Sequence, residues 1–80
     1  MDTHTAIANR ILELCEENHL TPNGLSNLAG VSQSTVKSIL NGESRNPGSV
    51  TIKKLCDGLG ITIDEFFHSD LFVGLEQEIK

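Results

Sequence analysis

Residues 28–42, LAGVSQSTVKSILNG, combine short apolar repeats with side chains that can form hydrogen bonds at a surface. The second half of this stretch turns one polar face outward, and that face carries no acidic residue. Two short helices joined by a tight bend can contact DNA when the second helix is exposed and lies in a groove. The pattern therefore indicates recognition chemistry, supplied by Gln33, Ser34, Lys37 and Ser38, with Thr35 at the edge of the face.

Five helical segments are expected to position this face. Apolar residues three and four apart, with flanking capping residues, place the first four segments near residues 3–18, 22–29, 33–40 and 50–59. A fifth begins at residue 63 and runs into the phenylalanines. Because no alternating strand pattern, internal repeat or low-complexity tract stands out, the sequence predicts an all-α fold.

The bend between the second and third segments is predicted residue by residue. Thr21 caps the second segment, and Pro22 suits its first turn because proline lacks the N–H that has no partner there. Gly30 supplies the left-handed residue that ends this helix, Val31 fills the angle, and Ser32 caps the third segment. The two helices are therefore expected to be joined by three residues.

Further local signals fix the remaining helices. Ser49 can cap the fourth segment. Thr62 and Glu65 match a capping box for the fifth, since each side chain can bond the backbone N–H of the other. In the second segment, Leu28 is expected to face the core beside Leu25.

Composition limits the class of protein. Eighty residues with a largely aliphatic core suffice for one small domain. No apolar run approaches a membrane span and no export signal opens the chain, so a cytoplasmic protein is expected. Cys15 and Cys56 occupy apolar positions and are expected to be buried, reduced thiols. Since His4, His19 and His68 are scattered, we expect surface histidines and no metal, cofactor or small-molecule site.

The net charge of −5 is unevenly distributed along the chain. Residues 1–19 carry −3 and residues 57–80 carry −5, whereas residues 20–56 carry +3. The positive part holds the polar face, so it can face DNA while the acidic ends face away. The cations of this part are Lys37, Arg45, Lys53 and Lys54, opposed only by Glu43. Because they are few, weak non-specific binding to DNA is expected.

We expect a domain at residues 1–68, followed by a tail at residues 69–80. Leu71, Leu75 and Ile79 recur at four-residue steps and predict a short sixth helix, unless the tail frays. The apolar side chains of this region can cover the domain's own core, pair with a second copy, or bind another protein. The candidate dimer contact comprises Phe66, Phe67, Leu71, Phe72 and Leu75.

The bend and its surroundings form a pattern found in a known family. Its residues here are Leu25, Leu28, the run from Ala29 to Val36, Ile39, Asn41, Gly42, Asn46, Pro47, Leu55, Leu59, Gly60, Ile61, Asp64, Glu65 and Phe66. On these residues, residues 5–67 of the chain resemble the helix-turn-helix DNA-binding domains of the phage repressor and Cro type, also called Xre-like. The resemblance implies a compact five-helix domain, a bacterial or phage transcription regulator that is usually a dimer, and residues 33–40 as the recognition helix.

By position, the resemblance assigns base contacts to Gln33, Ser34 and Ser38. Glutamine at the head of such a helix can pair two-pronged with adenine, and serine can donate to or accept from several bases. The same correspondence implies backbone or outer contacts by Thr21, Asn23, Thr35, Lys37, Asn41, Arg45 and Asn46.

The function expected from the sequence is a regulator that binds double-stranded DNA in the major groove as a homodimer, as a repressor rather than an activator. The alternative is a protein-docking helix-turn-helix module, antitoxin-like or partner-binding, with weak DNA binding, and the apolar tail favours it. An enzyme is not expected, since the sequence shows no nucleophile–base pair, phosphate-binding glycine loop or metal cluster.

Overall fold

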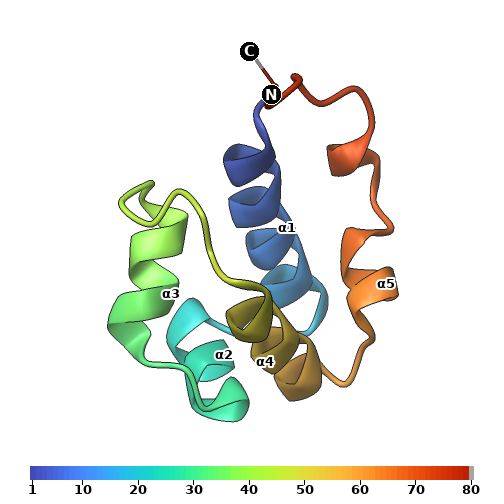
Figure 1. Ribbon diagram of the computed structural model, residues 1–80. Helices are drawn as coiled ribbons and strands as arrows, with labels where there is room; N and C mark the ends of the chain where they lie inside the picture. The colour runs from blue at the N-terminus through green and yellow to red at the C-terminus, as the bar shows by residue number, and fades with distance from the viewer. Residues whose placement is uncertain (80) are drawn as a thin grey trace.

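Five α-helices and one turn of 3-10 helix make up the protein, in a computed structural model that describes residues 1–79 (Figure 1). The all-α prediction is confirmed. The elements are α1 (Thr3–Glu17), α2 (Pro22–Ala29), α3 (Gln33–Leu40), α4 (Ser49–Leu59), α5 (Ile63–Phe67) and the 3-10 turn η1 (Asp70–Phe72).

Helix α1 runs through the middle of the molecule, with α3 on one side of it and α5 with the tail on the other (Figure 1). Its inward side joins α2, α3 and α4 in one aliphatic core, and Phe66 of α5 completes that core. Cys15 and Cys56 are free, buried thiols within it, as predicted. Burial raises the pKa of both, which keeps them neutral near pH 7.

The packing of α2 on α4 is close enough to exclude a side chain. A Cβ atom added to Gly58 would lie 2.9 Å from both the Cα and the N atom of Ala29, closer than side-chain carbons normally approach backbone. Glycine at this position is therefore a packing requirement, although it lowers the helix propensity of α4. Because α3 follows α2 after a short bend, this contact also determines where α3 lies.

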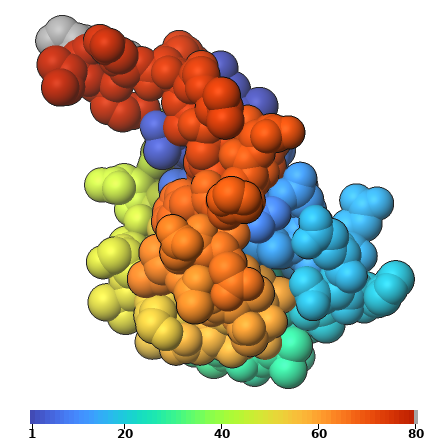
Figure 2. Space-filling model, turned by 90° about the vertical axis from the view of Figure 1, so that its right-hand side faces the viewer, coloured from blue at the N-terminus to red at the C-terminus, as the bar shows by residue number. Residues whose placement is uncertain are grey.

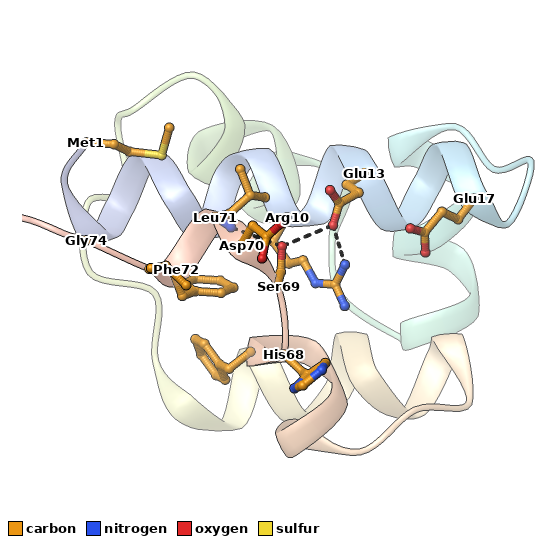
Figure 3. Close-up of a pocket in the computed structure, with 12 residues that line it drawn as sticks. Met1, Arg10, Glu13, Glu17, His68, Ser69, Asp70, Leu71, Phe72 and Gly74 are labelled. Carbon is orange, nitrogen blue, oxygen red and sulfur yellow. Dashed lines mark hydrogen bonds and ion pairs between the residues drawn. The ribbon is translucent and has the colours of Figure 1, made fainter.

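Arg10 ties α5 to α1 from a buried position (Figure 3). Its Nε donates to the carbonyl oxygen of Phe66 (2.6 Å) and its Nη2 to that of Glu65 (2.9 Å). Its Nη1 pairs with Glu13, which also accepts a bond from the Ser69 hydroxyl (3.4 Å). A helix of only five residues is thus held through its own last carbonyls and the residues that follow it.

The predicted ends of the five helices agree with the structure to within one residue, and the predicted caps are confirmed with one exception. Thr21 and Ser32 accept bonds from backbone N–H groups of α2 and α3, and the capping box of α5 has both of its hydrogen bonds. The exception is Ser49, which is the first residue of α4 rather than its cap. Gly48 occupies the capping position and offers no side-chain acceptor.

One turn occurs twice in the chain. Helices α2 and α4 both end at a left-handed glycine, Gly30 with φ 66° and Gly60 with φ 71°. In each case the next residue is apolar, Val31 or Ile61, and its N–H bonds a carbonyl of the helix just ended. A hydroxyl-bearing residue then caps the following helix.

Two burial expectations are wrong. Leu28 is 58% exposed, because it lies about 100° around α2 from Ala29, on the side open to solvent. His4 is buried rather than on the surface, since the first turn of α1 lies against the end of α3. His19 and His68 are exposed, as expected.

The predicted sixth helix is a single 3-10 turn. Gly74 takes a left-handed conformation (φ 72°), which ends any helical course, and Ile79 is 90% exposed. The tail instead lies beside the start of the chain, where the N–H of Glu76 donates to the Met1 carbonyl oxygen (3.2 Å). Figure 2 shows the tail, in red, beside the blue first residues. Within residues 1–79, no helix has the length and apolar character needed to cross a bilayer.

Replacing Gly58 with alanine tests the α2–α4 contact. We expect Gly58→Ala to lower the free energy of unfolding by about 1–3 kcal/mol, because helix backbones must separate to admit the methyl group. Asn27→Ala is the control, since this exposed side chain on α2 lies away from the contact and its loss should not lower stability. Urea unfolding followed by circular dichroism measures both. Equal stability of Gly58→Ala and the unchanged protein would contradict the proposed packing requirement.

Candidate nucleic-acid interface

Helix α3 is anchored by one side and leaves the other in solvent. Val36 and Ile39 lie in the core. Gln33, Ser34 and Lys37 are exposed on the opposite side, and Ser38 is half-buried. The structure therefore places the polar face where the sequence predicts it, and α3 begins and ends at the predicted residues.

The hydroxyl groups at the head of α3 form a small cluster. Ser32 Oγ accepts from the backbone N–H of Thr35 and lies 2.7 Å from Thr35 Oγ1. The Ser34 hydroxyl is 3.2 Å from the same Ser32 oxygen. Thr35 is therefore engaged with the cap, whereas Ser34 and its neighbour Gln33 remain exposed for contacts outside the protein.

The amino end of α2 presents two of the predicted backbone contacts. Thr21 and Asn23 are both exposed. Thr21 Oγ1 accepts from the N–H of Gly24 (3.0 Å), and this leaves its hydroxyl proton free to donate. A hydroxyl and an amide at a helix amino end suit a phosphate oxygen.

The loop after α3 holds the other predicted contacts, and two of them already have partners. It is folded back on α3 by a bond from the Ser44 N–H to the Ser38 carbonyl (2.9 Å). The Asn41 amide donates to the Glu43 carboxylate and accepts from the Glu43 backbone N–H, each at 3.0 Å. Arg45 is paired with Asp2. Asn46 is exposed.

The amino end of α1 positions both α3 and its loop, which the sequence did not reveal. His4 Nε2 donates to the carbonyl oxygen of Ile39 in the last turn of α3 (2.9 Å). Asp2 caps α1 by accepting from the Thr5 N–H (2.8 Å) and holds Arg45 at the same distance. Asp2 is recognisable as a capping residue by its type, but contacts that span 35 and 43 residues leave no local pattern.

Ion pairs reduce the number of free cations near α3. Lys53 pairs with Asp57 one turn away on α4, and Arg45 pairs with Asp2. Within residues 1–79, Lys37 and Lys54 have no such partner. Lys37 is thus the exposed positive charge on the polar face itself.

The predicted dimer contact needs one correction. Phe66 is fully buried in the core of its own chain, so it offers no surface to a second molecule. Phe67 is partly exposed and meets Phe66 and Phe72 with ring centroids 4.9 and 5.0 Å apart. Leu71, Phe72 and Leu75 are half-buried. Phe67, Leu71 and Phe72 line a groove of about 870 Å³ between α1 and the tail (Figure 3).

A family model and two solved structures all relate this chain to helix-turn-helix proteins. A family model described as helix-turn-helix matches residues 11–66. The chain is similar to the crystal structure of the prophage Lp1 protein 11, with a TM-score of 0.80 and 34% identity over 94% of this chain and 100% of that one. It is also similar to an HTH_3 family transcriptional regulator from Vibrio cholerae, with a TM-score of 0.76 and 31% identity over 85% of this chain. The match spans only 38% of the Vibrio chain. A search of curated proteins gave no significant match.

Truncating His4 tests how α1 positions α3. We expect His4→Ala to lower the free energy of unfolding by about 1–2 kcal/mol, because a buried hydrogen bond and its packing are lost. Amide hydrogens in the last turn of α3 should then exchange faster. The exposed His68 provides the control variant His68→Ala, which should change neither property. Unaltered exchange in α3 of His4→Ala would show that the bond does not hold the helix.

Proposed function

Because the chain belongs to the helix-turn-helix family, we propose that it is a regulator that binds specific sequences of double-stranded DNA with α3 in the major groove. The family and its HTH_3 transcriptional-regulator relative support a DNA-binding role and not an enzymatic one. We propose repression as its action, since a protein seated on an operator excludes other proteins from that DNA.

The main observation behind this proposal is the exposed polar face of α3. Gln33 stands at its amino end, where a side-chain amide can meet the hydrogen-bonding edge of adenine. Ser34 and Ser38 lie along the same helix, and Lys37 adds charge beside them. Thr21 and Asn23, at the amino end of α2, suit the phosphates that set the position of the protein on the duplex.

Specific contacts must supply most of the affinity. Each neutralised phosphate contributes to salt-dependent binding, and this face has few cations that are free of internal partners. An eight-residue recognition helix also reaches few base pairs. We therefore propose a homodimer, which places two such helices in successive major grooves about 34 Å apart.

The surface proposed for dimerisation is the apolar side of α5 and the tail, formed by Phe67, Leu71, Phe72 and Leu75. It lies across α1 from α3, so pairing there leaves the polar face open (Figure 1). Glu17 and Asp70 also line the groove. Two copies would bring these like charges together, so the dimer should tighten as salt screens them.

The primary experiment selects bound duplexes from a random library at low salt and sequences them. A two-fold symmetric motif with half-sites about one helical turn apart supports the proposal. The absence of enrichment, in a sample shown to be folded, contradicts sequence-specific binding and favours the protein-docking alternative.

Substitutions on α3 separate base contacts from phosphate contacts. On the selected duplex, Gln33→Ala should lose discrimination at one base position by about 1–3 kcal/mol, because its two-pronged bond is lost. Lys37→Ala should weaken binding to all duplexes alike if the lysine contacts phosphate. Competition binding with single-base variants of the duplex measures both. An unchanged preference in Gln33→Ala removes that residue from base recognition.

Sedimentation tests the proposed dimer. The unchanged protein should sediment as a dimer at micromolar concentration, and Phe67→Ala should shift it to monomer because part of the apolar contact is lost. Leu28→Ala removes an exposed leucine from α2 and should leave the dimer intact. A monomeric unchanged protein, with a tail cut readily by protease, would instead indicate a surface for a different partner.

A further inference from the structure

The two carboxylate oxygens of Asp2 serve different parts of the protein. Oδ1 accepts the Thr5 N–H and caps α1, whereas Oδ2 accepts Nη2 of Arg45 (2.8 Å). Hydrogen bonding from Thr5, reinforced by the charge of Arg45, lowers the pKa of Asp2 to about 2. The carboxylate is thus ionised under any condition in which the protein would meet DNA.

Arg45 lies in the loop that the Ser44–Ser38 bond holds against α3. Its side chain is 61% exposed, and within residues 1–79 Asp2 is its only hydrogen-bond partner. A carboxylate and a phosphate both offer a guanidinium negatively charged oxygen atoms, to which two of its N–H groups can donate side by side. Asp2 therefore gives Arg45 the same kind of hydrogen-bond acceptor that a phosphate of the DNA backbone would give it.

We propose that Asp2 acts as an internal substitute for a DNA phosphate, and that DNA binding exchanges the Asp2–Arg45 pair for an Arg45–phosphate pair. This inference rests on the proposed DNA-binding function. In the free protein the pair is electrically neutral, so Arg45 adds little to long-range attraction. After the exchange, Asp2 is left unpaired near the backbone. Asp2 thereby lowers affinity for all duplexes alike without affecting the choice of sequence.

Asp2→Asn is the informative variant because asparagine caps helices about as well as aspartate. The substitution removes the charge opposite Arg45 and keeps an oxygen for the Thr5 N–H. We expect its thermal stability to stay close to that of the unchanged protein. Its affinity for the selected duplex should rise about three- to ten-fold at low salt, and the slope of log K against log salt should steepen by up to about one.

Three companion variants separate the proposed exchange from simpler effects. Glu16→Gln removes an equal charge from the far end of α1, outside the groove proposed for dimerisation, and should change affinity less than two-fold. Arg45→Ala should weaken binding, and adding Asp2→Asn to it should bring little further change. If Asp2→Asn improves binding equally with and without Arg45, Asp2 acts only as a general repulsive charge and the proposal is overturned. Unchanged or weaker binding by Asp2→Asn also overturns it.

Elution from heparin distinguishes this inference from the proposed function. Heparin offers sulfate oxygens without base sequence, so Asp2→Asn should elute at higher salt than Glu16→Gln even if no operator is found. Identical elution of the two variants contradicts the exchange. If no duplex is enriched but the two variants elute at different salt concentrations, sequence-specific binding is contradicted and the proposed exchange is not.

Discussion

The contact between the backbones of Ala29 and Gly58 sets the geometry on which the proposed interface depends. At a separation that admits no Cβ atom, α2 cannot slide or rotate on α4 without a clash or a gap. Gly30 and the two residues after it then fix the direction of α3 from the end of α2. The position of the polar face therefore depends on a glycine that lies outside the helix-turn-helix, together with the contacts that the amino end of α1 makes with α3.

Helix α1 connects the two sides of the molecule. Near its middle, Arg10 holds the carbonyl end of α5, and at its start His4 and Asp2 hold the end of α3 and its loop. Arg10 supplies a partner for the Phe66 carbonyl near the end of this five-residue helix, and adds a second donor to the Glu65 carbonyl, which also accepts from the His68 N–H. A helix that contacts both the side proposed to bind DNA and the side proposed for dimerisation provides a physical link between them.

Local signals in the sequence were enough to predict most of the fold. Capping residues and helix-ending glycines act over three or four residues, so α2, α3 and the start of α5 are found where Thr21, Ser32 and Thr62 predict them. The polar face of α3 follows from helical spacing alone. Some failures are local, such as Leu28 at the solvent side of α2 and Gly48 in place of Ser49 as the cap of α4, and others depend on distant partners. The burial of His4 requires α3, and the replacement of a sixth helix by a short turn reflects Gly74 and the contact with Met1.

The repeated turn has a consequence for how such chains are identified. Glycine, an apolar residue and a hydroxyl-bearing cap join α2 to α3, and the same three types of residue join α4 to α5 with almost the same glycine conformation. The first turn leads into a helix with a solvent-exposed polar side, and the second leads into one whose Phe66 is fully enclosed. The turn is thus a general connector between short helices, and a search for it alone would find two candidates in this chain. Only the surface of the helix that follows separates a recognition element from a piece of the core.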